Sequence, residues 1–239
     1  MKILVTGYTG QLGFDVIREL KTRNIECIGA TRNEFSLTDI EKMQAFVKAY
    51  KPDVVIHCAA YTAVDKAEDE VELCAQINHL ATKELANVCK EIDAKMIYIS
   101  TDYVFAGSGE DFYEVNDEKA PQNVYGKSKL DGELAVQEIL DKYFIVRISW
   151  VFGSNGKNFI KTMLNLAKNH DKLTVVNDQI GSPTYTVDLA KLLCDMALSN
   201  KYGVYHATNE GICSWYDFAC EIFKQSDIKI NVEPVPSTA

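Results

Sequence analysis

Tyr125, Lys129 and Thr101 carry side chains that could move a proton to or from a carbonyl group. Tyr125 and Lys129 are four positions apart, so on a helix they would share a face, with β-carbons about 6 Å apart. The Lys129 ammonium, together with the positive charge of an oxidised nicotinamide, could then lower the Tyr125 pKa from about 10. Such a tyrosine can donate a proton to a carbonyl oxygen as hydride reaches the carbon. The Thr101 hydroxyl can donate a second hydrogen bond to that oxygen.

A glycine-rich turn at the start of the chain could hold the cofactor that supplies the hydride. Gly7, Gly10 and Gly13 follow the apolar run 3–5 and open a helical pattern. Such a turn lets the backbone approach a pyrophosphate and directs the first N–H groups of the helix at the anion. The alternative interpretation is a glycine turn that binds no ligand.

The position of these motifs matters, because a chain with 12 tyrosines contains about one Y-x-x-x-K by chance. Thr101 ends an apolar run, Tyr125 begins a helical pattern, and the glycines follow the first apolar run. Parallel α/β sheets gather their functional groups at the carboxyl ends of strands. We therefore expect the motifs to meet there, in preference to a structural tyrosine and a surface lysine.

Short apolar runs alternate with helical patterns through the first 150 residues. This alternation predicts an α/β fold with a doubly wound parallel sheet of the Rossmann type. The expected strands lack strict polar alternation, as strands buried on both faces do; they cover 2–6, 25–30, 53–58, 95–100 and 144–149. Helices are expected after Gly10, after a capping box at Thr38 and Glu41, and over 64–91.

The remainder of the chain predicts a small C-terminal lobe that binds substrate. Helices are expected over 158–168, 186–198 and 214–224, and strands over 173–176 and 204–207. We assign residues 1–152 and about 184–207 to the dinucleotide-binding domain. Residues 153–183 and 208–239 then form the substrate lobe.

Composition excludes several classes of function. A net charge of −9 argues against a nucleic-acid partner, which would require a basic surface. Seven cysteines without a C-x-x-C motif predict thiols in a reducing cytoplasm. No apolar run approaches about 18 residues, so no membrane span is expected. The four histidines lack ligand spacing, and no metal is predicted.

The end of the second strand bears on the choice of cofactor. An acid at this position usually holds the adenosine ribose of NAD, but here the strand continues into Thr31 and Arg32, with no acid before Glu34. Because an arginine can receive a 2′-phosphate, the sequence favours NADP over NAD. A solvated loop arginine is the alternative.

Longer stretches of the chain resemble the extended short-chain dehydrogenase/reductases, and within them the dTDP-4-dehydrorhamnose reductases. The similar stretches are VTGYTGQLG (5–13), AAYTAVDKAE (59–68), STDYVF (100–105), YGKSKL (125–130), RISWVFG (147–153) and NDQIGSPT (177–184). The last two, with residues 214–217, are more specific than the glycines. The resemblance implies that NADPH delivers hydride to C4 of dTDP-4-dehydro-β-L-rhamnose, a nucleotide sugar, giving dTDP-β-L-rhamnose.

The resemblance also implies roles for single residues. Tyr125 would be the acid, Lys129 would hold the nicotinamide ribose, and Thr101 would polarise the ketone. Thr101, Asp102 and Trp150 would contact the sugar, and Asn78 is a candidate for the active-site asparagine of the family. Cofactor contacts are expected from Gly7, Gly10, Gln11, Leu12, Gly13, Thr31, Arg32, Ser36, Leu37, Ala60, Tyr61, Thr62, Ile99, Tyr125 and Lys129.

Two departures from the family pattern concern ligand contacts. Ser36 stands where relatives usually have an Asp near the adenine. Relatives also continue beyond residues 235–239 into an Arg-bearing segment that helps to hold the nucleotide diphosphate, so the substrate lobe is expected to be truncated. The bridging Mg²⁺ of some relatives uses a carboxylate from that segment.

Other functions and assemblies stay open from the sequence. The regulatory subunit of methionine adenosyltransferase resembles the same family and binds a partner enzyme. A sugar-nucleotide epimerase or dehydratase would return its cofactor unchanged. Intact Thr101, Tyr125 and Lys129 favour a reductase, and a homodimer is one expected assembly.

Overall fold

The computed structural model describes residues 1–109 and 111–238. Glu110, in an acidic stretch of the sequence, and Ala239, in the predicted substrate lobe, lie outside the described residues. Within the described ranges, every helix is too short or too polar to cross a membrane.

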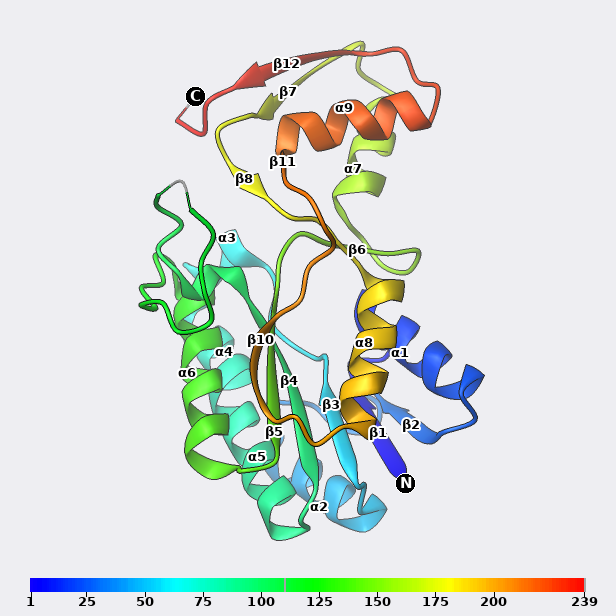
Figure 1. Cartoon of the computed structure of the whole chain (residues 1–239), viewed down its shortest axis with the longest axis vertical. Coiled ribbons are helices and arrows are strands. Elements are labelled where there is room, and N and C mark those ends of the chain that lie inside the picture. Colours follow the sequence, from blue (N-terminus) through cyan, green and yellow to red (C-terminus); the bar gives the residue numbers. More distant parts are fainter. Residues whose placement is uncertain (110, 239) are drawn as a thin grey trace.

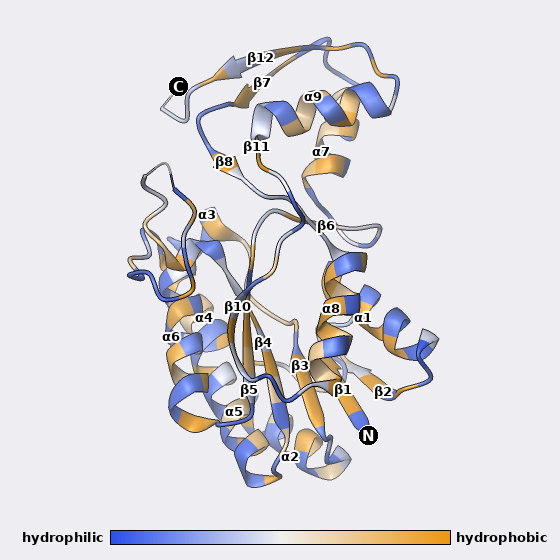
Figure 2. Ribbon diagram, in the orientation of Figure 1, coloured by the Kyte–Doolittle hydropathy of each residue, from blue (hydrophilic) through white to orange (hydrophobic). Residues whose placement is uncertain are grey.

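A six-stranded parallel sheet forms the centre of the larger part of the molecule, with strand order β10-β5-β4-β3-β1-β2 (Figure 1). This architecture confirms the predicted α/β fold with a Rossmann-type sheet. Apolar residues run continuously along the inner strands (Figure 2), and all seven residues of β4 are buried. The bounds are β1 Lys2–Thr6, β2 Glu26–Ala30, β3 Val54–His57, β4 Lys95–Thr101, β5 Tyr143–Ile148 and β10 Gly203–His206.

Helices cover both faces of this sheet and produce two apolar clusters. On one face, Leu12 and Val16 of α1 pack with Leu193 of α8 in one cluster. On the other, Val47 of α2, Leu85 of α5 and Val136 of α6 pack in a second cluster. The bounds are α1 Gln11–Thr22, α2 Ile40–Tyr50, α5 Ala81–Glu91, α6 Val124–Ile139 and α8 Thr186–Leu198.

The helical stretch expected over about 64–91 is confirmed except at residues 68–70, where the chain leaves the helix. The chain forms α3 Val64–Ala67, α4 Val71–Ala75, a π-helical segment Gln76–Leu80, and then α5. The acids between α3 and α4 make contacts elsewhere: Glu68 accepts from the Val124 N–H at 2.9 Å, and Glu70 accepts from the Tyr61 hydroxyl at 2.7 Å. These contacts accompany the break, and helical periodicity does not reveal them.

The capping box expected at Thr38 and Glu41 was also wrong. The cap of α2 is Asp39, whose carboxylate accepts from the Lys42 N–H at 3.1 Å. Asp and Thr are both good caps, and here the aspartate one residue later meets the N–H group. A capping box does form at α9 Trp215–Gln225, between Ser214 and Asp217.

A small C-terminal lobe stands over the carboxyl ends of the sheet strands (Figure 1). Strands β7 and β12 pair in parallel against α7 and α9, and Met163, Val175 and Phe223 are buried between them. Strand β12 was not predicted. The other bounds are β6 Val151–Phe152, α7 Phe159–Leu166, β7 Lys172–Val176, β8 Ile180–Gly181, β9 Thr184–Tyr185, β11 Cys213–Ser214 and β12 Asn231–Val235. The domain boundaries themselves stay a prediction.

Candidate active site

A cleft of about 1260 Å³ opens at the carboxyl ends of the sheet strands. Its wall contains the glycine turn after β1, the ends of β2, β3 and β4, the start of α6, and the segment after β5. Of the predicted site residues, Gly7, Gly10, Gln11, Leu12, Thr31, Arg32, Ser36, Leu37, Ala60, Thr62, Ile99, Thr101, Asp102, Tyr125, Lys129 and Trp150 line it.

The glycine turn leaves space for a ligand to lie close to the backbone at the start of α1. Gly7 has φ +66°, and a β-carbon there would lie 2.8 Å from the Ala59 Cα. A β-carbon on Gly13 would lie 2.5 Å from the Gly7 carbonyl oxygen, so Gly13 lets the helix pack under the turn and is not part of the cleft wall. No side chain caps the start of α1 at Gly10 among the described residues. The first N–H groups of α1 therefore suit a phosphate anion.

The first acid after β2, Glu34, forms hydrogen bonds within the turn that follows the strand. Glu34 accepts from the backbone N–H and the hydroxyl of Thr31, each at 2.7 Å. These hydrogen bonds hold the pKa of Glu34 below its usual value. Arg32 lies on the cleft wall beside Ser36 and is exposed. An arginine without the ribose-binding acid in front of it suits a 2′-phosphate.

Thr101, Tyr125 and Lys129 come together because β4 ends where α6 begins. Asn123 caps α6, accepting from the Gly126 N–H at 2.7 Å. The helix can approach the end of β4 only with glycine at 126, since a β-carbon there would lie 2.2 Å from the Tyr103 carbonyl oxygen. The Thr101 hydroxyl donates to the Asp102 carboxylate at 2.9 Å.

Burial dominates the electrostatics of Tyr125 and Lys129. Burial raises the pKa of Tyr125, and a hydrogen bond with Thr101 opposes that rise. Burial also lowers the pKa of Lys129 to about 7, and Glu133 opposes that fall. Removing both groups from water favours their neutral forms, so in the protein alone the Tyr125 pKa lies above its ordinary value. The predicted lowering of this pKa, which requires Lys129 together with an oxidised nicotinamide, stays a prediction.

Asn78 lies in the π-helical segment and connects the segment after β3 to helix α6 by hydrogen bonds. Its amide oxygen accepts from the Tyr61 N–H at 2.8 Å. Its amide nitrogen donates to the Tyr61 carbonyl and to the Ser128 hydroxyl, each at 3.0 Å. The Tyr61 side chain does not line the cleft, because its hydroxyl donates to Glu70. π-helical segments occur often at functional sites, but the sequence carried no signal for this one.

Trp150 is held in a sparsely populated backbone conformation, with φ +47°. Its indole stacks on Trp215 of α9, with ring centroids 3.6 Å apart and planes at 12°. Gly181 of β8 packs against the other part of the ring, where a β-carbon would lie 2.6 Å from it. The sequence predicted a helix over 214–224 but did not show this contact.

The segment after β6 ties the C-terminal lobe to the glycine turn, which the sequence did not reveal. The Asn155 amide donates to the carbonyl oxygens of Thr9 and Gly10, at 2.8 and 3.1 Å. The Asn158 amide donates to the Gln11 side chain at 3.0 Å. Lys157, between them, lines the cleft and adds a cation to its wall.

The sheet, the glycine turn and the Thr-Tyr-Lys group on one cleft define an oxidoreductase of the short-chain dehydrogenase/reductase class. The family model described as RmlD substrate binding domain matches residues 1–239. The chain belongs to this family.

Relatives agree with this assignment. The chain is 42% identical over 228 residues to the spore coat polysaccharide biosynthesis protein SpsK of Bacillus subtilis, covering 95% of this chain and 80% of that protein. It is 40% identical to the dTDP-4-dehydrorhamnose reductase of Aggregatibacter actinomycetemcomitans, covering 98% and 82%. The crystal structure of dTDP-4-dehydrorhamnose reductase from Bacillus anthracis in complex with NADP has a TM-score of 0.96 and 42% identity, covering 99% of this chain and 85% of that one.

Proposed function

We propose that the protein reduces the C4 ketone of dTDP-4-dehydro-β-L-rhamnose to dTDP-β-L-rhamnose with NADPH. The observation that carries the proposal is the convergence of Thr101, Tyr125 and Lys129 on the cleft that also contains the glycine turn. Relatives named dTDP-4-dehydrorhamnose reductase, at 38–40% identity, support the choice of substrate.

The residues present fit the cofactor. The uncapped start of α1 and the absence of β-carbons at Gly7 and Gly10 suit a pyrophosphate, and Arg32 suits a 2′-phosphate. NADPH, when bound, supplies the hydride. Asp102 and Trp150, which also line the cleft, would contact the sugar, with the carboxylate accepting from hydroxyl groups and the indole packing on the ring.

In the reduction, Tyr125 donates its phenolic proton to the ketone oxygen as hydride adds to C4. Burial favours the protonated phenol, so Tyr125 is in the correct form for an acid at neutral pH. The Thr101 hydroxyl turns from Asp102 toward the developing alkoxide and donates a hydrogen bond to it. Lys129 lies one helical turn from Tyr125 and stabilises the phenolate that remains.

The reaction is tested by the loss of NADPH absorbance with dTDP-4-dehydro-L-rhamnose. We expect one NADPH consumed per product, since an epimerase or a dehydratase would return its cofactor unchanged. No turnover with this substrate would refute the proposal. Cofactor binding without turnover, together with a stoichiometric complex in a pull-down, would instead support a regulatory subunit.

The preference for NADPH over NADH also belongs to the proposal. Steady-state kinetics should give a higher kcat/KM with NADPH, and Arg32→Ala should reduce that advantage while leaving kcat/KM with NADH little changed. An NADH efficiency equal to or above that of NADPH in the parent protein would contradict it.

We further propose a cytoplasmic location and a homodimer. All seven cysteines are free thiols, which suits a reducing compartment. Several apolar side chains are exposed on helical segments that cover the sheet, among them Leu80 and Leu134. Light scattering after size-exclusion chromatography should give twice the mass of 26.8 kDa for one chain, and the monomer mass would refute the dimer.

A further inference from the structure

Lys129 is a buried cation whose nearest acid already has a partner. Its exposed fraction is 2%. Glu133, on the same helix, raises the pKa of Lys129, but both carboxylate oxygens accept from Arg147, at 2.9 and 2.7 Å. Glu133 and Arg147 are themselves buried, so this acid is largely neutralised before it acts on Lys129.

The group directly against the Lys129 ammonium is an aromatic ring. The Nζ atom lies 4.0 Å from the centroid of the Tyr98 ring. Tyr98 is fully buried in β4, three residues before Thr101. The face of an aromatic ring attracts a cation, and the attraction is strongest where water is excluded.

The Tyr98 ring is held in place from several sides. Its hydroxyl lies 3.3 Å from the carbonyl oxygens of Asn78 and Lys129, to which it can donate. His57 stacks beside it, with centroids 6.0 Å apart and planes at 24°. A β-carbon on Gly132 would lie 2.3 Å from the hydroxyl oxygen, so glycine at 132 lets α6 approach the ring.

Other ionisable groups around Lys129 do not supply a steady counter-charge. Hydroxyl groups of Thr6 and Thr82 lie 2.7 and 3.3 Å from the two ring nitrogens of His57, whose pKa burial lowers to about 3. His57 is therefore neutral at physiological pH. The remaining groups are Cys58 after β3, whose pKa burial raises to about 12, Cys74 on α4, and Tyr125 and Glu133 on α6.

We propose that Tyr98 is a positioning residue for Lys129: its ring face holds the buried ammonium, and its hydroxyl fixes the backbone of the helix turn that carries it. The inference rests on the proposed reductase function only for its kinetic readout. Tyr98 touches neither substrate nor cofactor, since it does not line the cleft. It acts by keeping Lys129 charged and directed toward the Tyr125 side of α6.

The first test uses NMR of the full-length protein labelled with ¹³C-lysine, and it does not depend on turnover. The Lys129 signal is assigned by its absence from Lys129→Met. Because the side chain ends over a ring face, its CH₂ protons next to the ammonium should resonate upfield of those of exposed lysines. Resonance at the position of exposed lysines would overturn the proposal, without the need for any Tyr98 variant.

The second test follows the Lys129 titration in Tyr98→Phe and Tyr98→Leu. Phe keeps the ring face, so the midpoint should stay at that of the parent protein. Leu removes the face, so the midpoint should fall by about one pH unit. Equal midpoints in the parent protein and Tyr98→Leu would overturn the proposal, as would an equal fall in both variants.

A matched control separates this effect from general loss of packing. Phe144→Leu removes a buried ring on β5 and should lower Tm while leaving the Lys129 midpoint unchanged. In kinetics, the alkaline limb of kcat/KM should move to lower pH in Tyr98→Leu, because activity requires the ammonium. If the parent protein does not oxidise NADPH, the proposed function fails, and the NMR titration still decides the role of Tyr98.

Discussion

At the scale of single residues, Tyr125 is the side chain on which the proposed reduction depends. Tyr125→Phe removes the acidic hydroxyl but keeps the buried ring, so kcat should fall by about 10²–10⁴-fold with NADPH affinity largely retained. Stopped-flow or steady-state absorbance gives kcat, and fluorescence titration gives the affinity. Tyr143→Phe, at the start of β5, is the control. A Tyr125→Phe protein with parental kcat would remove Tyr125 from its proposed role.

The Lys129 pKa makes a prediction about stability and pH. Burial lowers this pKa from 10.5 to about 7, so between these values the unfolded chain binds more protons than the folded one. The free energy of unfolding therefore rises with pH across that window. Below pH 7 the folded protein carries the full destabilisation that comes from burying the Lys129 charge. Lys129→Met should raise Tm at pH 6.5, and the gain should disappear near pH 10.5.

Thermal unfolding followed by circular dichroism at several pH values measures this effect. Lys168→Met, which changes an exposed lysine, should alter Tm little at either pH. A Tm gain in Lys129→Met that is the same at both pH values would show that the charge of Lys129 does not destabilise the folded protein.

Sequence spacing was sufficient to predict that Thr101, Tyr125 and Lys129 would lie on one cleft, because strand ends in a parallel sheet share an edge. It was not sufficient for their protonation. The direction of the Tyr125 pKa depends on how completely the folded chain excludes water, and that burial is set by residues far apart in sequence. The Tyr98 ring against Lys129 was missed for the same reason.

At the scale of elements, the glycine turn is supported by a segment of the C-terminal lobe. Asn155 donates to two carbonyl oxygens of the turn, and Asn155→Ala removes both hydrogen bonds. At about 0.5–1.5 kcal/mol for a net hydrogen bond, we expect roughly a 3- to 10-fold weaker NADPH affinity. kcat at saturating NADPH should change less.

Fluorescence titration with NADPH measures this change in affinity. Asn165→Ala, on the exposed side of α7, is the matched control and should bind NADPH as the parent protein does. Equal affinities for Asn155→Ala and the parent protein would show that the turn keeps its shape without the lobe.

Secondary structure was predicted well where apolar periodicity is the main signal and less well where side chains set the boundary. The strands of the sheet and helix α8 follow from their apolar pattern. The interruption before α4 does not, because Glu68 and Glu70 bond to groups brought near by the fold. The π-helical segment that contains Asn78 also has no sequence signal of its own.

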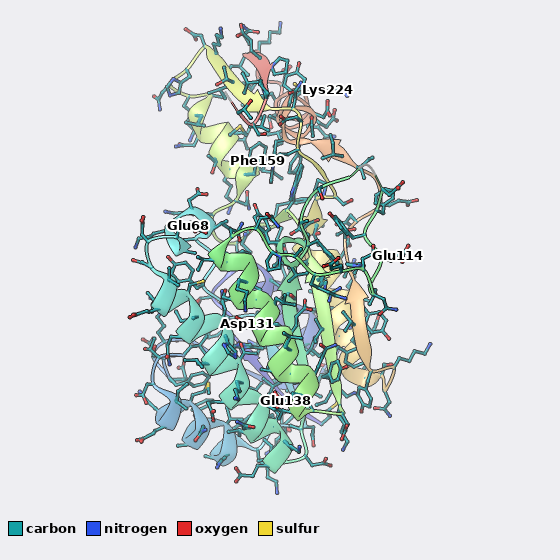
Figure 3. All side chains as sticks on the ribbon, turned by 90° about the vertical axis from the view of Figure 1, so that its left-hand side faces the viewer. Glu68, Glu114, Asp131, Glu138, Phe159 and Lys224 are labelled. Atoms are coloured by element: carbon teal, nitrogen blue, oxygen red, sulfur yellow. The ribbon has the colours of Figure 1, made fainter. Side chains whose placement is uncertain are left out.

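α6 shows how one element serves both packing and chemistry. Asp131 and Glu138 are labelled on this helix in Figure 3, and Glu138 is exposed, whereas Gly132 and Glu133 are buried. The buried side is unusually polar, with Ser128, Lys129 and Glu133. A helix with polar residues on its inner side loses hydrophobic stabilisation, and here Arg147 pairs with Glu133 while the Tyr98 ring faces the Lys129 ammonium.

At the scale of the whole molecule, two stacked indoles join the sheet to the C-terminal lobe. Trp150 follows β5 and Trp215 begins α9, and these are the only tryptophans of the chain. Phe159 of α7, labelled in Figure 3, lies 4.6 Å from Trp215 between ring centroids. The orientation of Trp150 therefore depends on the lobe, although the residue belongs to the sheet side of the cleft.

This arrangement predicts that loss of the stack weakens binding of the nucleotide sugar but not of NADPH. Trp215→Leu removes the stacking partner of Trp150, so the wall of the sugar site loses its support while the glycine turn keeps its contacts. Aromatic pairs contribute about 0.5–1.5 kcal/mol beyond their burial, so KM for the nucleotide sugar should rise by up to about tenfold, with KM for NADPH little changed. Far-ultraviolet circular dichroism should show an exciton couplet from the paired indoles that Trp215→Leu abolishes. Phe218→Leu, on the same helix, should keep the couplet, and an equal rise of both KM values in Trp215→Leu would show that the stack supports the lobe as a whole.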